Sequence, residues 1–295
     1  MTSETITVAA SGTWRLGDLA VRRVGFGAMR LTHLADGSPT DRERMVSVLR
    51  LAVERGVNHI DTASFYFSPT RSANELINRA LAPYGDDLVI TTKVGPGRDF
   101  AGQWWWATPE QLRGQVEENL RQLGRDHLDV VNLRIPRRET TGSIAEHFGA
   151  LAELRAAGLV RHLGLSNVRP DHLAEARAIA PVVCVQNPYG IGSPAEDHAF
   201  LDACGQEGIA FVPFFAIAGA GKEAGVVVAQ ETEQVRAVAE AHGVSAAQVR
   251  LAWTLNRGPH VLAIPGTGNP GHLVENIAAG ALRLSPEEMA LLEAA

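Results

Sequence analysis

Short runs of β-branched and other apolar residues alternate along the chain with longer segments in which apolar residues recur at helical spacing. The short runs are typical of buried strands, and the longer segments are typical of amphipathic helices. Eight strands are predicted, at Val24–Gly27, Val57–Asp61, Leu88–Lys93, Leu128–Leu133, Val160–Leu165, Val182–Gln186, Ile209–Pro213 and Val261–Ile264. A helix is predicted after each strand, at Asp41–Arg55, Ser72–Leu81, Pro109–Leu123, Ser143–Ala157, Pro170–Ile179, Ala195–Gln206, Ser245–Leu255 and Pro270–Ala278.

Helix boundary signals agree with this division. Thr108 followed by Pro109, and Ser245 ahead of an alanine-rich run, are N-cap arrangements. Four of the helices should stop at a glycine, namely Gly56, Gly124, Gly158 and Gly208. Strand-then-helix units that repeat eight times without a composition break predict the fold class α/β, as a (β/α)8 TIM barrel in a single domain over residues 1–295.

Three segments lie outside this repeat. Residues Ile6 to Ala20 are predicted to form an N-terminal β-hairpin that turns at Ser11-Gly12 and closes the bottom of the barrel. Glu233–Ala241 is predicted as a helix inserted after the seventh strand, and Pro286–Ala294 as an additional C-terminal helix.

Composition excludes several classes of protein. The chain is 45% hydrophobic and 20% charged, which is ordinary for a globular protein, and its net charge of -6 comes from interspersed acids and bases without the basic stripe that nucleic acid requires. The start has no secretory signal pattern and no segment offers a long apolar span, so we expect a cytoplasmic protein without membrane contact. Cys184 and Cys204 lack metal-ligand spacing and are predicted to be buried free thiols, with no metal site.

Polar, charged or aromatic residues follow seven successive strands. In a parallel barrel the C-terminal ends of the strands form the active face. The residues at these ends are Asp61, Lys93, Arg134, Ser166-Asn167, Gln186, Phe214 and Gly266-Thr267. Some polar residues are expected at strand ends by chance, but so complete a series predicts a functional site.

Asp61, Tyr66 and Lys93 are the candidate catalytic group. A phenol is a poor acid at neutral pH, and a neighbouring ammonium makes it a better proton donor. Asp61 would hold Lys93 protonated, and Lys93 would assist Tyr66, in a relay suited to protonating an alkoxide as hydride arrives. Taken singly, Asp61 fits a loop cap, Tyr66 a packing residue and Lys93 an exposed charge, but their joint spacing favours the relay.

These residues resemble the aldo/keto reductase family over nearly the entire chain and in the family's order. The matching motifs are Val24-Gly25-Phe26-Gly27-Ala28-Met29-Arg30, Asp61-Thr62-Ala63 with Tyr66, Lys93, Gly164-Leu165-Ser166-Asn167, Gln186-Asn187, and Ile264-Pro265-Gly266-Thr267 with Glu275-Asn276. The resemblance implies a barrel, a nicotinamide dinucleotide as first ligand, and reversible reduction of a small-molecule carbonyl substrate.

The resemblance also implies a role for each matching position. Tyr66 is then the general acid, tuned by Lys93 and Asp61. Residues implied to contact the cofactor are Met29 on strand one, Ser166, Asn167 and Gln186 at the nicotinamide carboxamide, Phe214 at the nicotinamide ring, Gly266 and Thr267 at a phosphate, His272 near the 2′-phosphate, and Glu275 and Asn276 at the adenine.

Three positions depart from the family pattern, one at the catalytic site and two at the cofactor site. Arg134 stands where the family usually has a histidine, so it could stabilise an alkoxide, fix an anionic substrate group, or merely form a salt bridge to Asp61 or Glu139. Gly266 and His272 stand where NADP-dependent members commonly have basic residues. The resemblance to the family still favours NADPH as the cofactor, and NADH stays possible. The sequence leaves the oligomeric state open.

The strand-to-helix loop at residues 95–106 carries three consecutive tryptophans, Trp104, Trp105 and Trp106. They predict either an aromatic wall for a flat substrate or a loop anchored by burial, and Phe65 and Phe215 are further candidates for the substrate pocket. The motif around Arg134 and the Phe214-Phe215 pair resemble a bacterial subgroup that includes pyridoxal reductases, which implies an aromatic aldehyde.

Two other functions would explain part of the sequence. A dinucleotide-sensing or regulatory barrel with little catalysis would keep the cofactor residues while the catalytic ones drift, and the absent histidine favours this reading. The presence of Asp61, Tyr66 and Lys93 opposes it. A barrel in which Lys93 forms a Schiff base would leave the cofactor residues unexplained.

Overall fold

The computed structural model describes residues 6–33, 37–99, 101–217 and 232–294. Seven parallel strands form one sheet, in the order β13-β12-β11-β10-β7-β4-β3. In chain order these strands are β3 (Phe26–Gly27), β4 (His59–Asp61), β7 (Val89–Val94), β10 (Leu128–Arg134), β11 (Val160–Ser166), β12 (Val182–Gln186) and β13 (Ala210–Phe211).

The predicted eighth strand closes this sheet into a barrel. Parallel bridges join Val261 to Phe211 on one side and Ala263 to Val24 on the other. The backbone N–H of Ala263 donates to the carbonyl of Arg23 at 2.7 Å, and that of Leu262 donates to Phe211 at 2.9 Å. The eight-stranded barrel predicted from the sequence is therefore confirmed.

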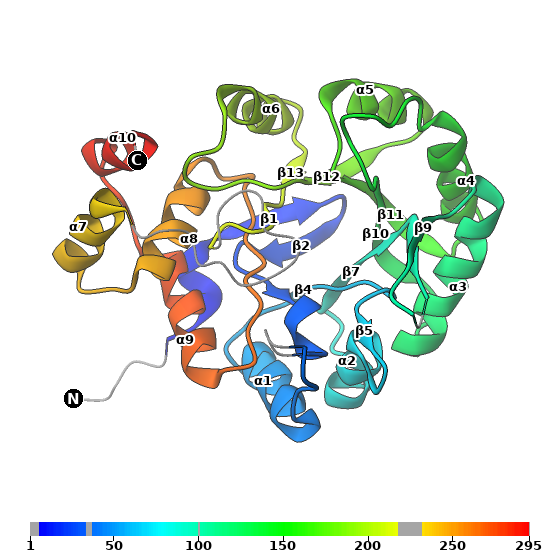
Figure 1. Ribbon diagram of the computed structural model, residues 1–295, viewed down its shortest axis with the longest axis horizontal. Coiled ribbons are helices and arrows are strands. Elements are labelled where there is room, and N and C mark those ends of the chain that lie inside the picture. Colours follow the sequence, from blue (N-terminus) through cyan, green and yellow to red (C-terminus); the bar gives the residue numbers. More distant parts are fainter. Residues whose placement is uncertain (1–5, 34–36, 100, 218–231, 295) are drawn as a thin grey trace.

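Helices surround the strands as a ring (Figure 1). The ring consists of α1 (Arg42–Glu54), α2 (Ala73–Leu81), α3 (Leu112–Leu123), α4 (Ala145–Ala156), α5 (Pro170–Ile179), α6 (Ala195–Gln206), α8 (Ala246–Asn256) and α9 (Pro270–Ala278). The inserted helix α7 (Glu233–His242) and the last helix α10 (Pro286–Glu293) pack against each other outside it, where His242 and Glu288 bond at 2.7 Å. The four glycines predicted to end helices all have positive φ, which only glycine adopts without strain.

The N-terminal hairpin exists, but the predicted turn is wrong. Its strands are β1 (Thr13–Leu16) and β2 (Leu19–Arg22), joined at Gly17-Asp18, whereas Ser11 ends a short 3-10 helix, Val8–Ser11. Both dipeptides are good turn formers locally. The register at Gly17-Asp18 places Leu16 and Val21 together against the barrel interior, and burial of these side chains decides between the two.

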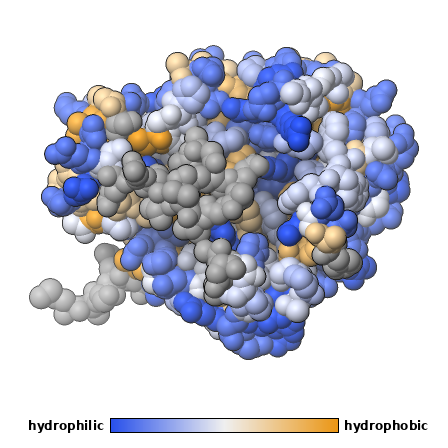
Figure 2. Space-filling view, viewed as in Figure 1, coloured by the Kyte–Doolittle hydropathy of each residue, from blue (hydrophilic) through white to orange (hydrophobic). Residues whose placement is uncertain are grey.

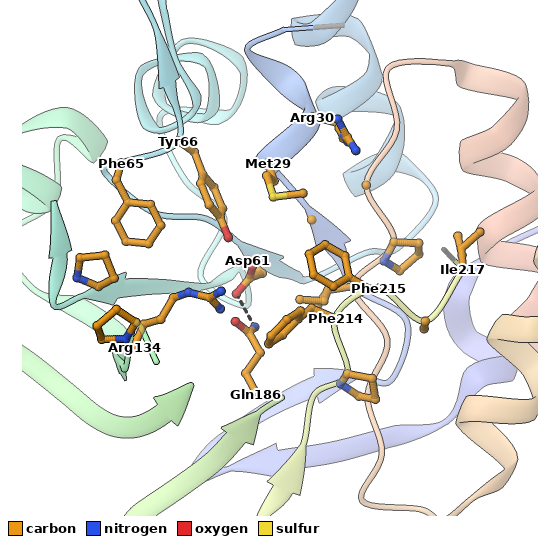
Figure 3. Close-up of a pocket in the computed structure, with 18 of the residues that line it drawn as sticks. Met29, Arg30, Asp61, Phe65, Tyr66, Arg134, Gln186, Phe214, Phe215 and Ile217 are labelled. Carbon is orange, nitrogen blue, oxygen red and sulfur yellow. Dashed lines mark hydrogen bonds between the residues drawn. The ribbon is translucent and has the colours of Figure 1, made fainter. Parts of the chain in front are cut away.

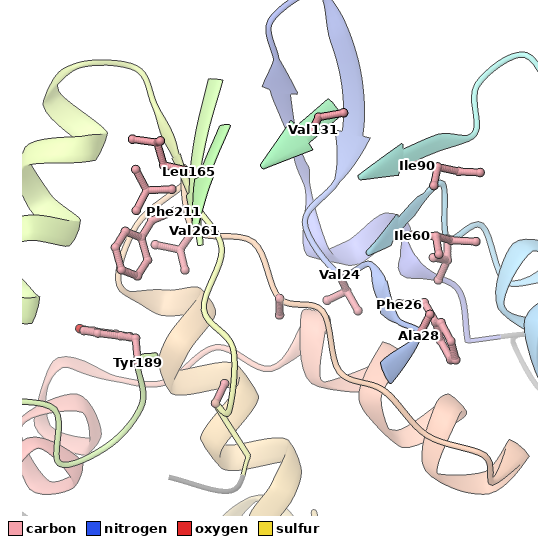
Figure 4. Close-up of a cluster of buried hydrophobic side chains, with 14 of the residues drawn as sticks. Val24, Phe26, Ala28, Ile60, Ile90, Val131, Leu165, Tyr189, Phe211 and Val261 are labelled. Atoms are coloured by element: carbon pink, nitrogen blue, oxygen red, sulfur yellow. The ribbon is translucent and has the colours of Figure 1, made fainter. Parts of the chain in front are cut away.

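Apolar packing divides into two clusters. A small cluster fills the lower interior of the barrel, where Leu16 and Val21 of the hairpin contact Val130, Cys184 and Leu262, so the predicted closure of the barrel bottom is confirmed. The larger cluster lies between the strands and the surrounding helices (Figure 4). Hydrophilic residues cover most of the outer ring in Figure 2.

Two short antiparallel ribbons extend from the strand ends. They are β5 (Phe67–Ser68) with β6 (Arg71–Ser72), and β8 (Pro96–Arg98) with β9 (Trp104–Trp106). The loop predicted at residues 95–106 is thus a β-ribbon over its two ends. Within the described residues, every helix is too short or too polar to cross a membrane, and we find no cluster of His, Cys, Asp or Glu that could hold a metal ion.

Candidate functional site

A cavity of about 700 Å³ opens at the C-terminal ends of the strands, which is a usual size for a small-molecule site. Its walls combine aromatic rings with a few charged groups. The aromatic members are Phe65, Tyr66, Trp104, Trp105, Trp106, Phe214 and Phe215, and the charged members are Arg30, Asp61, Arg134 and Arg137. The predicted substrate residues and most of the predicted catalytic residues therefore meet in one place.

Asp61 and Lys93 form a buried ion pair at the floor of this cavity. They end adjacent strands β4 and β7, and Lys93 Nζ donates to Asp61 Oδ1 at 2.6 Å and to the carbonyl of Thr62 at 3.0 Å. Burial alone would lower the pKa of Lys93, but the Asp61 carboxylate and the Tyr66 hydroxyl outweigh burial and raise it. Lys93 is therefore held as an ammonium.

Tyr66 lies above this pair. Its side chain points into the cavity with the hydroxyl directed towards Asp61 (Figure 3), and Lys93 Nζ lies 4.8 Å from the centre of its ring. The loop holds Tyr66 through two backbone hydrogen bonds, from its own N–H to Ala63 and from the N–H of Ala73 to its carbonyl. Phe65 packs edge-on against the phenol ring at 5.2 Å.

Gln186 reaches the same carboxylate from the other side of the barrel. Its Nε2 donates to Asp61 Oδ2 at 2.8 Å, so both oxygens of Asp61 are bonded. Its Oε1 is buried and accepts no hydrogen bond within the described residues. Ser166 is fully buried at the end of the neighbouring strand β11, and Asn167 follows it with a φ of 60°, a conformation that few residues other than glycine adopt.

Arg134 projects into the middle of the cavity (Figure 3). One guanidinium nitrogen donates to Ser166 Oγ at 3.2 Å, and the guanidinium carbon lies 4.9 Å from the centre of the Phe214 ring. The two acids predicted as possible salt-bridge partners have other partners, since Asp61 bonds to Lys93 and Gln186, and Glu139 pairs with Arg138. The role of Arg134 stays a prediction.

Backbone atoms replace side chains where the first and eighth strands meet. A Cβ at Gly266 would lie 2.4 Å from the carbonyl oxygen of Gly27, and a Cβ at Gly27 would lie 2.5 Å from that of Ile264. Beyond this contact Asn269 caps α9, since its Oδ1 accepts from the N–H of Gly271 at 2.9 Å. A capped helix start beside side-chain-free backbone suits a phosphate group.

The remaining predicted cofactor residues divide between the cavity and its surroundings. Met29 and Gly266 line the cavity, whereas Thr267 accepts a hydrogen bond from the N–H of Asn269 in the turn before α9. His272 and Glu275 are exposed on α9, and Asn276 is buried there. All three lie on α9, and their roles stay predictions.

The three tryptophans are arranged by the β8–β9 ribbon, and all three line the cavity. Trp106 stacks on His147 with ring centres 4.2 Å apart. Trp104 and Trp105 are 60% and 45% exposed at the cavity mouth, and Trp104 meets Phe65 edge-on at 5.7 Å. Trp106 is therefore anchored by stacking, whereas Trp104 and Trp105 line the cavity mouth, and their contact with a flat substrate stays a prediction.

Sequence reasoning missed Arg30 and Arg137, which also line the cavity. Arg30 directly follows Met29, and Arg137 stands three residues beyond Arg134, so both lie next to positions that the strand-end pattern identifies. Neither forms an ion pair within the described part of the chain, and together with Arg134 they give the cavity a positive lining that suits an anionic ligand.

The arrangement fits a nicotinamide dinucleotide. Gln186 Oε1 offers an unused buried acceptor for a carboxamide amine, Phe214 offers a ring face, and the Gly27–Gly266 contact followed by the capped start of α9 accommodates phosphate.

Comparison with known proteins gives consistent matches. The family model for the aldo/keto reductase family matches residues 23–295. Pyridoxine 4-dehydrogenase of Escherichia coli (strain K12) is 44% identical over 290 residues, covering 96% of this chain and 98% of that enzyme. Among solved structures, a thermostable aldo-keto reductase in complex with the inhibitor epalrestat superposes with a TM-score of 0.80 at 29% identity, covering 96% of this chain and 98% of that one. An aldo-keto reductase from Klebsiella pneumoniae in complex with NADPH gives 0.77 at 27% identity, covering 96% and 94%.

Proposed function

The chain belongs to the aldo/keto reductase family, and we propose that it reduces an aromatic aldehyde of the pyridoxal type to the alcohol with NADPH. The chain is an NAD(P)-dependent oxidoreductase, and the observation that carries the finer proposal is the position of Tyr66 between the buried Asp61–Lys93 pair and an aromatic wall. When bound, the dinucleotide supplies the hydride.

The proposed proton donor is Tyr66. Its hydroxyl is directed to the floor of the cavity, where Lys93 is held as an ammonium by Asp61. A positive charge next to a phenol stabilises the phenolate that remains after proton transfer, so it promotes transfer of the proton to the alkoxide. Asp61 is in turn fixed by Gln186, which prevents the pair from reorienting. Arg134 supplies a second positive charge for the developing alkoxide, in place of the family's histidine.

The dinucleotide would be held by Gln186, Ser166 and Asn167 at the carboxamide, by Phe214 at the nicotinamide ring, and by the start of α9 at a phosphate. Arg30 adds a positive charge to the same cavity. NADPH is proposed because related structures were solved with NADP or NADPH. NADH remains the alternative, because Gly266 and His272 stand where NADP-dependent members commonly have basic residues for the 2′-phosphate.

Support for an aromatic aldehyde comes from two sources. The relative that is 44% identical is named as a pyridoxine 4-dehydrogenase, which acts on an aromatic alcohol. In this chain, Phe65 and Trp104 extend the ring of Tyr66 outward as a series of edge-on contacts at 5.2 and 5.7 Å. Such a wall favours a flat ring, since aromatic pairs are stabilised beyond their buried area.

A Schiff-base function is not supported. A nucleophilic lysine must lose its proton readily, yet the pKa of Lys93 is raised by its environment and its ammonium donates to Asp61 and Thr62. The charged pair suits a residue that assists Tyr66.

The test is NADPH-dependent reduction of pyridoxal, followed by the loss of cofactor absorbance, in the wild type and in Tyr66→Phe. We expect turnover to fall by about two orders of magnitude or more while the Kd of NADPH is kept, because a general acid contributes about 10²–10⁴-fold. Tyr84→Phe is the matched control, since Tyr84 donates to the carbonyl of Leu123 between α2 and α3, away from the cavity. Equal turnover in Tyr66→Phe would remove Tyr66 from the mechanism.

A further inference from the structure

Arg134 makes the two contacts that the proposed function assigns to the nicotinamide group. Its guanidinium donates to Ser166 Oγ, which is otherwise a carboxamide contact, and lies over the ring of Phe214, which is otherwise the face for the nicotinamide. Ser166 is fully buried, and Phe214 is flanked by Phe215 at a ring distance of 5.0 Å. The Arg134 side chain therefore occupies both predicted nicotinamide contacts, Ser166 and Phe214, at once.

These contacts leave no room for a second flat group. The guanidinium carbon lies 4.9 Å from the centre of the Phe214 ring. Two planar groups on either side of a third need a separation of about 7 Å, because each stacked layer takes about 3.5 Å. A nicotinamide ring on this face of Phe214 and the observed position of Arg134 therefore exclude each other.

We propose that Arg134 is a placeholder that the dinucleotide must displace from Ser166 and Phe214. This inference rests on the proposed function, because it takes Ser166 and Phe214 as nicotinamide contacts. The displaced guanidinium stays tethered at the end of β10, beside Tyr66 and Asp61, where a substrate carbonyl would lie. Cofactor binding then places the positive charge at the substrate, and carbonyl reduction follows with Arg134 in its second position.

The placeholder has a distinctive consequence, because the same residue weakens cofactor binding and supports turnover. Every contact that Arg134 makes to Ser166 and Phe214 must be broken before the dinucleotide binds. A charged hydrogen bond and a cation–π contact are both lost, so their removal by substitution should tighten the dinucleotide by about 10-fold. Residues that merely line a binding site change affinity in the opposite direction when they are truncated.

The experiment measures the Kd of NADPH by quenching of tryptophan fluorescence, and kcat with pyridoxal, in Arg134→Met and in Arg137→Met. Arg137 lines the same cavity and carries the same charge, so Arg137→Met controls for the loss of long-range attraction to an anionic cofactor. We expect Kd to fall about 10-fold and kcat to fall about 100-fold in Arg134→Met. In Arg137→Met we expect Kd to stay equal or to rise.

An unchanged or raised Kd in Arg134→Met, relative to Arg137→Met, would overturn the placeholder. Should Arg134→Met fail to fold, Arg134→Lys decides, because lysine keeps the charge but has neither the planar face nor the forked donors. Its Kd should fall by a smaller factor, and no change would overturn the inference. Failure of the proposed function has a different signature, namely NADPH binding by the wild type without turnover of any aldehyde, and the Kd comparison would still be decisive.

Discussion

The two halves of the barrel interior are built from the same strands with opposite chemistry. The lower half is apolar and closed, since Leu16 and Val21 of the hairpin pack on Val130, Cys184 and Leu262. The upper half holds the buried Lys93–Asp61 pair, Gln186 and Ser166, and opens into the cavity. On β12, Cys184 faces the lower half and Gln186 the upper half, two residues apart on one face of the strand.

We expect the lower half to contribute mainly to stability and the upper half mainly to the chemistry of the site. Burial of apolar side chains stabilises the fold directly, whereas a buried ion pair is weak evidence for stability because both charges lose their hydration. We therefore expect apolar burial, and not the charged upper half, to supply most of the stability. Cys184 belongs to the stabilising half, since burial raises the pKa of its thiol to about 12 and keeps it neutral.

The largest effect is expected from breaking the upper ion pair. Lys93→Met leaves the buried Asp61 carboxylate without its counter-charge, so the free energy of unfolding should fall by about 3–5 kcal/mol, together with loss of turnover. Urea unfolding measures the change in the free energy of unfolding. The double variant Lys93→Met/Asp61→Asn should recover much of the stability and none of the turnover, because the unpaired charge is then removed. Full stability in Lys93→Met alone would show that the pair is not electrostatically coupled.

A void created by mutation in the lower half should lower stability without lowering turnover. Leu16→Ala removes a fully buried side chain from the barrel bottom, and we expect the free energy of unfolding to fall by about 3 kcal/mol. Because Leu16 lies at the opposite end of the barrel from the ligand cavity, kcat/KM for the folded enzyme should be unchanged. Leu19→Ala, at the partly buried position paired with Leu16 across the hairpin, is the matched control and should lower the free energy of unfolding by less. A loss of kcat/KM would show that the two halves are coupled.

The smallest effect concerns His59, which lies on β4 two residues below Asp61. Burial lowers its pKa from 6.5 to about 4, with Asp61 opposing this and Lys93 adding to it, and its Nε2 is paired with Thr91 Oγ1 at 3.0 Å. The unfolded chain thus takes up a proton at a higher pH than the folded chain, so stability from this group is complete above pH 6.5 and is lost as the pH falls towards 4.

Between pH 7 and pH 5 this loss amounts to about 2 kcal/mol. The difference in unfolding free energy between wild type and His59→Gln, measured by urea unfolding at both pH values, isolates it from other titrating groups. The variant should show a shallower pH dependence by that amount. Parallel pH curves for the two proteins would show that His59 does not carry the effect.

Local sequence signals were sufficient for most of the fold. All eight predicted helices and the strands between them are confirmed, because helical and strand periodicities are local and four glycines with positive φ mark helix ends. The hairpin turn was wrong, since Ser11-Gly12 and Gly17-Asp18 are similar turn signals and packing of Leu16 and Val21 decides between them. The ribbon at Trp104–Trp106 was expected as a loop, because its pairing with Pro96–Arg98 depends on a cross-strand register.

The barrel and the candidates Asp61, Tyr66, Lys93 and Gln186 could be predicted from periodicity, because it locates the strand ends and one end of a parallel barrel gathers them all. The bonds among these side chains depend on the folded barrel. Gln186 meets Asp61 across 125 positions of sequence, and Arg134 contacts Ser166 and Phe214. The physical reason is that closure and register of the barrel set these distances, and neither is encoded in the local spacing of apolar residues.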